Sequence, residues 1–225
     1  MQEVSAKRET QPLHEWVYHA ICENILAGKF VPGVSVTLRG LAENLNVSPM
    51  PVREAIRRLV AEGALEVLAN RRVCVSYMSK TRLSDLNYAR LSMEPELAQR
   101  AFDNIDKNKI KELQKIDQEI NESLLSGNVD TYIICNRRFH FDIYERADSP
   151  VLFPLVKSLW LQYAPYTRIV FGRVGTEVLK DYHAVALTAI KRGDQAGFRQ
   201  AIKSDISEGM DMIAEQFERD QVVKK

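Results

Sequence analysis

Residues 38–75 constrain the fold more than any other part of the chain. Apolar residues recur at helical spacing in the first part, and residues 46–49 (Asn-Val-Ser-Pro) interrupt that period. A second helical period follows and ends at Gly63. Two short alternating segments then flank residues 69–72, which is typical of a β-hairpin. A helix, a tight turn, a second helix and a hairpin together predict a winged helix-turn-helix.

The second helix of this stretch has one apolar face and one basic face. Apolar residues repeat every three to four positions from Val52, while Arg53 and Arg57 lie one turn apart on the opposite side. A helix of this kind suits the major groove of DNA. The hairpin tip adds Arg71 and Arg72. The alternative interpretation is two packed helices, because most helical hairpins do not contact DNA.

Composition narrows the class of protein. The chain has 225 residues, of which 45% are hydrophobic and 27% charged, as in ordinary globular proteins. The net charge is +1, so any nucleic-acid binding must come from the local placement of arginines. The three cysteines form no paired motif, and neither a signal peptide nor a membrane-length apolar run is present. We therefore expect reduced thiols, a cytoplasmic location and no membrane partner.

The remainder of the chain is expected to be entirely helical, giving a mainly α fold. Strand patterns stop near residues 77–81, which places a domain boundary between 1–78 and 79–225. One helix is predicted upstream at 13–27 and six downstream at 83–103, 107–125, 129–146, 150–171, 176–191 and 195–219. Three prolines fall inside these spans and predict kinks or shifted boundaries: Pro95, Pro154 and Pro165.

Four residues of the helical region form a candidate metal site. Asn136 and His140 are four positions apart and so share one helix face, while His183 and Asp205 lie on two later predicted helices. Histidine and aspartate are common metal ligands, and three converging helices could hold one ion. The alternative is two unrelated histidines on polar faces. Spacing alone does not separate these interpretations.

Arg90 is followed one turn later by Glu94. The simplest interpretation is a surface or intrahelical ion pair that contributes little to stability. If the arginine were instead buried near a metal ion, it would hold a carboxylate through two hydrogen bonds.

The N-terminal segment resembles a known family. The segments that carry the resemblance are ILAGKFVPG (25–33), LRGLAENLNVS (38–48) and PVREAIRRLVAEGALE (51–66). They resemble the DNA-binding domain of GntR-type winged-helix transcription regulators. The resemblance implies operator contacts from Arg39 and Arg53, supported by Ser48, Met50 and Pro51. Two departures are Pro49, where many relatives have arginine, and Arg72, where the wing tip usually has glycine.

The C-terminal region resembles the FCD effector-binding domain of the FadR-type subfamily, in its shorter, VanR-like form with six helices. The resemblance rests on YARLSMEPELA (88–98), NRRFHFDIYERADSPVL (136–152) and HAVALTAIKRGD (183–194). Many FCD domains bind a divalent metal through one aspartate and three histidines. The matching positions here are Asn136, His140, His183 and Asp205. The resemblance implies Zn²⁺, Ni²⁺ or Mn²⁺ at this set, or a degenerate site in which the effector replaces the metal.

The resemblance also implies an effector. The arginine matching Arg90 often faces the effector cavity in FCD domains, which indicates a small organic acid. Arg137, Tyr163 and Arg168 are further candidates for the cavity lining, and we expect effector contacts from Arg90, Asn136, His140, His183 and Arg168.

Together these features predict a ligand-responsive transcription regulator. We expect a homodimer that binds double-stranded operator DNA, with repression relieved by a carboxylate metabolite as the sense of regulation. One alternative is a metal-dependent hydrolytic enzyme, but a general-base motif, a nucleophile elbow and a phosphate loop are all missing from the sequence, so we expect no enzyme. The other alternative is a DNA-binding protein whose C-terminal domain is purely structural.

Overall fold

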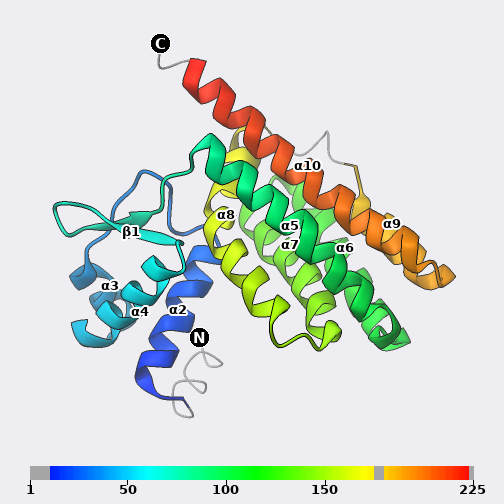
Figure 1. Ribbon diagram of the computed structural model, residues 1–225, viewed down its shortest axis with the longest axis horizontal. Helices are drawn as coiled ribbons and strands as arrows, with labels where there is room; N and C mark the ends of the chain where they lie inside the picture. The colour runs from blue at the N-terminus through cyan, green and yellow to red at the C-terminus, as the bar shows by residue number, and fades with distance from the viewer. Residues whose placement is uncertain (1–10, 175–179, 223–225) are drawn as a thin grey trace.

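Helices form most of the chain, and one small hairpin lies at one end of the molecule (Figure 1). The computed structural model describes residues 11–174 and 180–222. The N-terminal unit contains α2 (Leu13–Leu26), α3 (Leu38–Leu45), α4 (Pro49–Ala61), β1 (Leu65–Val67) and β2 (Val73–Val75). The strands pair antiparallel with Leu65 opposite Val75, and Val36 adds a bridge to Val73. The predicted winged helix-turn-helix is confirmed.

Local chemistry explains where α3 and α4 begin and end. The Thr37 hydroxyl accepts a hydrogen bond from the Gly40 N–H at 3.0 Å, as expected of an N-cap. Asn46 takes the left-handed conformation, φ +51°, and ends α3. Ser48 occupies the N-cap position of α4, but its side chain makes no capping hydrogen bond. Pro49 fits the first turn because a missing N–H costs nothing there.

The C-terminal unit contains the six predicted helices. They are α5 (Lys80–Ala101), α6 (Lys107–Ser126), α7 (Val129–Tyr144), α8 (Leu152–Val174), α9 (Tyr182–Arg192) and α10 (Gln195–Val222). Short 3₁₀ turns follow α5 at Phe102–Asn104 and α7 at Glu145–Ala147. Asp106 and Asp194 cap α6 and α10 through the N–H groups three residues on, at 2.7 and 2.8 Å.

Some predicted boundaries are wrong. The break expected at Gly172 is missing, and α8 continues to Val174, because an interior glycine weakens a helix by only about 1 kcal/mol. Helix α9 begins at Tyr182 rather than at residue 176, and the Asp181 carboxylate caps it. The intervening predicted residues 176–179 lie outside the described part of the chain. Pro154 falls in the first turn of α8, while Pro95 and Pro165 remain interior.

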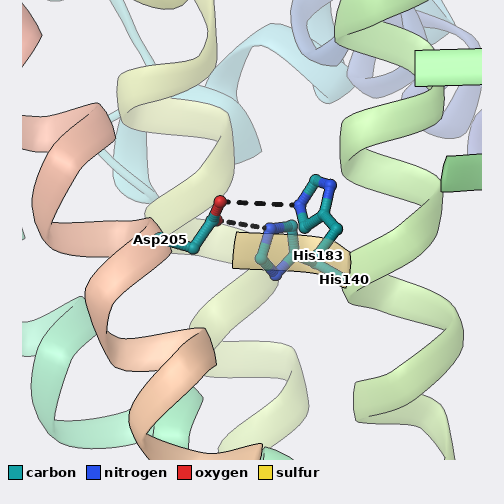
Figure 2. A group of neighbouring side chains, drawn as sticks. All are labelled: His140, His183 and Asp205. Carbon is teal, nitrogen blue, oxygen red and sulfur yellow. Dashed lines mark ion pairs between the residues drawn. The ribbon is translucent and has the colours of Figure 1, made fainter. Parts of the chain in front are cut away.

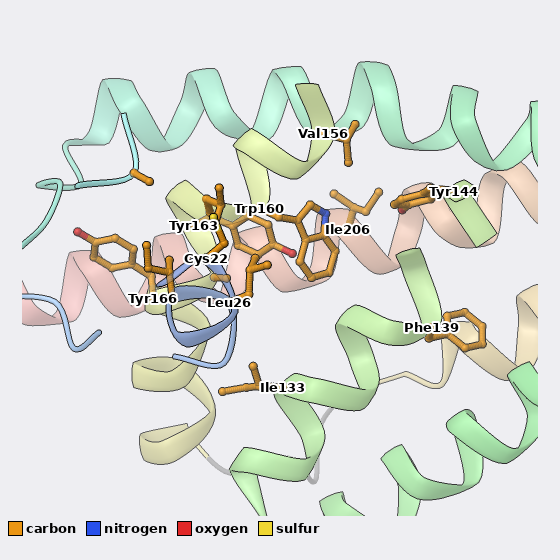
Figure 3. Packing of buried hydrophobic residues seen from close by; sticks show 14 of the residues in the cluster. Cys22, Leu26, Ile133, Phe139, Tyr144, Val156, Trp160, Tyr163, Tyr166 and Ile206 are labelled. Atoms are coloured by element: carbon orange, nitrogen blue, oxygen red, sulfur yellow. The ribbon is translucent and has the colours of Figure 1, made fainter. Parts of the chain in front are cut away.

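Helix α8 is central to the packing. It contacts α2 of the winged unit as well as α5, α7 and α10. Figure 3 shows Cys22 and Leu26 of α2 beside Trp160 and Tyr163 of α8 within one apolar core. Helix α8 therefore joins the two units, and α7 also contacts α2. Within residues 11–174 and 180–222, every helix is too short or too polar to cross a bilayer.

Candidate functional site

A cavity of about 90 Å³ lies inside the helical unit. Its walls come from α5 to α10, and they bring together five of the residues singled out in the sequence: Arg90, Asn136, His140, His183 and Asp205. Tyr163 also lines it. Because a water molecule needs only about 10–15 Å³ of such volume, the cavity has room for an ion and a small ligand or several waters.

His140, His183 and Asp205 converge within this cavity from α7, α9 and α10 (Figure 2). The Asp205 carboxylate lies 3.0 Å from His140 Nε2 through Oδ2 and 3.5 Å from His183 Nε2 through Oδ1. One ligand atom from each of the three residues lies within 4.8 Å of the others. This spacing suits three ligands of a single ion.

The charge states of these groups suit a cation. Burial lowers the pKa of His183 to about 4, so its imidazole is neutral near pH 7. Burial alone would raise the pKa of Asp205, but the adjacent His183 and His140 outweigh burial and lower it, so the carboxylate stays ionised. Neutral imidazoles and an ionised carboxylate are the forms that a metal ion requires.

Two observations test whether the residues fit a metal. The buried Nε2 of His183 has no hydrogen-bond partner in the part of the chain that the structure describes. His140 Nδ1 lies 3.0 Å from the Tyr144 hydroxyl, which itself donates to Glu94 at 2.8 Å. Because the Tyr144 hydroxyl donates to Glu94, its oxygen is free to accept from His140 Nδ1–H, which would leave His140 Nε2 to face the Asp205 carboxylate with either a proton or a bound ion between them. Two acceptors 3.0 Å apart repel unless a proton or cation lies between them, so the donor set fits a divalent ion.

Arg90 and Glu94 form the predicted pair within one helix, but the pair is not at the surface. The two residues are 4% and 0% exposed. Glu94 also accepts a hydrogen bond from Trp160 Nε1 at 3.1 Å, and the Arg90 guanidinium lies 3.7 Å from the centre of the Tyr163 ring. The interpretation as a surface pair is therefore wrong, and Arg90 forms part of the cavity wall.

Arg168, predicted to contact an effector, is not among the residues that line the cavity. Its guanidinium donates a hydrogen bond to Asp130, and its aliphatic carbons lie against Gly28. Arg137 likewise points away and makes two hydrogen bonds to Glu23, at 2.8 and 2.9 Å. Both arginines face the winged unit because α7 and α8 each contact it with one face and line the cavity with another.

Sequence reasoning missed Asp117 of α6. It lies in a stripe of buried residues that includes Leu113, Ile116 and Ile120. A carboxylate inside an apolar stripe is the signal that identifies it, because buried acids are rare unless they are paired. Its side chain lies 3.7 Å from His183.

The predicted DNA-contacting side chains are exposed, with one exception. Pro51 is buried on the inner face of α4, where a proline in this first turn packs against the core. Arg39 pairs with Glu43 at 2.9 Å and Arg72 donates to the Ser35 carbonyl at 2.7 Å. The exposed set comprises Arg39, Ser48, Met50, Arg53, Arg57, Arg71 and Arg72.

The wing tip is a three-residue loop. The Arg71 N–H donates to the Leu68 carbonyl at 2.8 Å, and the Leu68 N–H donates to the Arg72 carbonyl at 2.8 Å. Arg71 has φ +61°, so Arg71, rather than Arg72, occupies the left-handed position that favours glycine. The hairpin closes without the glycine expected there.

The chain matches two protein families and several known proteins. Residues 13–75 match bacterial regulatory proteins of the gntR family, and residues 85–208 match the FCD domain. The chain is 28% identical over 196 residues to the HTH-type transcriptional regulator McbR of Escherichia coli K12, covering 85% of this chain and 88% of that protein. It is 21% identical over 200 residues to the HTH-type transcriptional repressor RspR of the same organism, covering 88% of each. The solved structure of E. coli McbR/YncC superposes with a TM-score of 0.85 at 25% identity, covering 92% of this chain and all of that one.

Proposed function

This chain belongs to the GntR family of bacterial transcription regulators and carries an FCD domain, and from that premise we propose that it senses a small carboxylate held beside a divalent metal ion. The family consists of DNA-binding regulators rather than enzymes, which excludes the hydrolase alternative. The observation that carries the proposal is the single cavity in which His140, His183 and Asp205 meet beside Arg90.

His140, His183 and Asp205 would hold the metal, and Asn136 would offer its amide oxygen from the same cavity wall. Imidazole and carboxylate ligands suit Zn²⁺, Ni²⁺ or Mn²⁺. When bound, the ion would supply positive charge that attracts an acid. Arg90 alone attracts an anion weakly, because Glu94 already pairs with it. The effector would thus contact the ion and the edge of the Arg90 guanidinium together.

On the DNA side, we assign base contacts to Arg53 and Arg57 on the exposed face of α4 and a further contact to Arg39. Arginine can make two hydrogen bonds to guanine, which discriminates against other bases by about 1–3 kcal/mol. Ser48, Met50, Arg71 and Arg72 would contact the backbone or the adjacent groove, and basic contacts of this kind make affinity depend on salt.

Helix α8 would carry the signal. Tyr163 lines the cavity. Tyr166, three residues later on α8, donates a hydrogen bond at 2.8 Å to the carbonyl of Ser76, which directly follows β2. On the same helix, Gln162 accepts a hydrogen bond from Arg82 at 2.6 Å, and Arg82 also donates to the Gly63 carbonyl just after α4. An effector that shifts α8 would thereby alter the placement of the winged unit and the affinity for operator.

We further propose that the protein acts as a homodimeric repressor in the cytoplasm, with a winged unit at 1–78 and a helical unit at 79–225. The family matches at 13–75 and 85–208 lie on either side of that boundary. A two-fold dimer would present two copies of α4 to a palindromic operator.

A gel-shift titration tests the proposal. Operator affinity would be measured with chelator, with Zn²⁺, and with Zn²⁺ plus each of a panel of small mono-, di- and tricarboxylates. We expect at least one acid to change the affinity by about 5- to 150-fold, and only with metal present. A full panel without effect, in protein that binds operator, would refute the coupling. His140→Ala should abolish the response and leave affinity in chelator unchanged.

A further inference from the structure

The carboxylate of Asp117 faces His183 from the side opposite the cavity ligands. Its Oδ1 lies 3.7 Å from His183 Nδ1, whereas His183 Nε2, at the far edge of the ring, lies 3.5 Å from Asp205. The Asp117 side chain is 12% exposed, and its Oδ1 has no hydrogen-bond partner among the described residues.

An unpartnered buried carboxylate oxygen is costly. Leaving a buried acceptor unsatisfied destabilises the folded protein, and the cost is larger for a charged group. Asp117 lies in the apolar stripe of α6, where leucine would fill the space at no such cost. The contact with His183, a candidate metal ligand, explains why an aspartate rather than an apolar residue occupies this buried position.

We propose that Asp117 is the positioning residue for His183. It accepts the Nδ1 proton of the neutral imidazole, which fixes the tautomer that leaves the Nε2 lone pair directed at His140 and Asp205. The 3.7 Å separation is longer than a hydrogen bond, which needs about 3.2 Å or less, so the proposal requires the two atoms to approach each other by about 0.5 Å. Asp117 itself does not touch the ion.

The two histidines then have equivalent support. In this arrangement the Tyr144 oxygen, 3.0 Å from His140 Nδ1, has the same role for His140 that Asp117 has for His183. Partners of this kind orient metal-bound imidazoles, and their loss lowers metal affinity by about 10- to 100-fold. The effect on metal rests on the proposed function of the site, whereas the tautomer of His183 is a property of the chain without metal.

The test compares Asp117→Leu with Glu119→Leu. Glu119 lies two residues along the same helix, is exposed and contacts Cys135 Sγ at 3.3 Å, so its loss changes charge equally without affecting His183. The tautomer of His183 would be read from ¹⁵N shifts of the metal-free protein at pH 8, and Zn²⁺ affinity from calorimetry. We expect Nδ1–H in the wild type and Glu119→Leu, and loss of that preference in Asp117→Leu together with 10- to 100-fold weaker Zn²⁺ binding.

Stability separates positioning from a merely structural role. Asp117→Leu should keep or raise the melting temperature of the metal-free protein, because it removes an unpaired buried acid. If His183 of the wild type is the Nε2–H tautomer, the proposal is overturned, even if the variant does not fold. A folded Asp117→Leu variant whose His183 tautomer and Zn²⁺ affinity are both unchanged also overturns it. A wild type that binds no Zn²⁺ contradicts the proposed function of the site instead, and its His183 tautomer still decides the role of Asp117.

Discussion

At the scale of single residues, burial decides what an ion pair contributes. Helix α5 carries two pairs of similar spacing, Arg90–Glu94 and Glu96–Arg100. The first is buried beside the cavity, whereas the side chains of Glu96 and Arg100 are 38% and 51% exposed. Water screens the exposed pair, but removing one partner of the buried pair leaves an uncompensated charge.

Glu94→Gln should therefore lower the free energy of unfolding by about 3–5 kcal/mol, because Arg90 loses its counter-ion. Glu96→Gln, the matched control, should change it by less than about 1 kcal/mol. Urea unfolding of both variants measures the difference. Equal costs would show that the Arg90 charge is compensated elsewhere.

Arg53 is the residue on which sequence-specific binding should depend most. Its exposed side chain on α4 makes no ion pair among the described residues, so it is free to contact bases. Arg53→Ala should reduce operator affinity to the level of unrelated DNA, a loss of at least about 1–3 kcal/mol. Gel shifts with specific and scrambled duplexes measure it, with Arg100→Ala on the helical unit as the control. An unchanged ratio of the two affinities would remove Arg53 from the base contacts.

At the scale of elements, apolar periodicity predicts helices well but not which way a polar side chain points. The six helices of the C-terminal unit and the caps at Asp106 and Asp194 follow from local chemistry. The direction of Arg168 does not follow from its sequence position, because α8 is buried on several sides and its apolar period does not distinguish the cavity from α2. Asp117 was missed because its partner, His183, is 66 residues away in the sequence, and only the packing of α6 on α9 brings them together.

The junction between α2 and α8 depends on a glycine. Gly28 has φ +67°, and a side chain there would place Cβ 3.1–3.2 Å from carbons of Arg168. Gly28→Ala should thus combine left-handed strain of about 1–2 kcal/mol with crowding against α8. Gly33→Ala has the same strain, φ +82°, with open space around it among the described residues. Gly28→Ala should lower the free energy of unfolding more than Gly33→Ala does, and the difference measures the crowding against Arg168. Equal losses would show that Arg168 moves aside freely.

At the scale of the whole molecule, the helical and winged units share contacts that a regulatory signal can use. Arg137 follows Asn136 of the cavity wall directly on α7 and pairs with Glu23 of α2. The pair is partly exposed, so its contribution to stability is expected to be small, about 0.2–1 kcal/mol. Its value to the protein would lie in transmission rather than in folding.

Arg137→Glu should weaken the effector response of operator binding, while Zn²⁺ affinity stays unchanged because Arg137 does not line the cavity. Combining it with Glu23→Arg restores an oppositely charged pair and should recover the response. The measurement is the ratio of operator affinities with and without effector across this double-mutant cycle. A response of wild-type size in Arg137→Glu would exclude this contact from the coupling.

The helices that line the cavity differ in whether they contact the winged unit, and this difference affects how such regulators diversify. Helices α6 and α9 supply part of the lining, including Asn121 and Tyr182, and they pack chiefly on each other and on α7 and α10. Helix α8 supplies another part and contacts the winged unit. Substitutions on α6 and α9 can therefore change which molecule is sensed with little effect on the DNA-reading half, so duplicated copies of such a gene can acquire new inducers while keeping their operators.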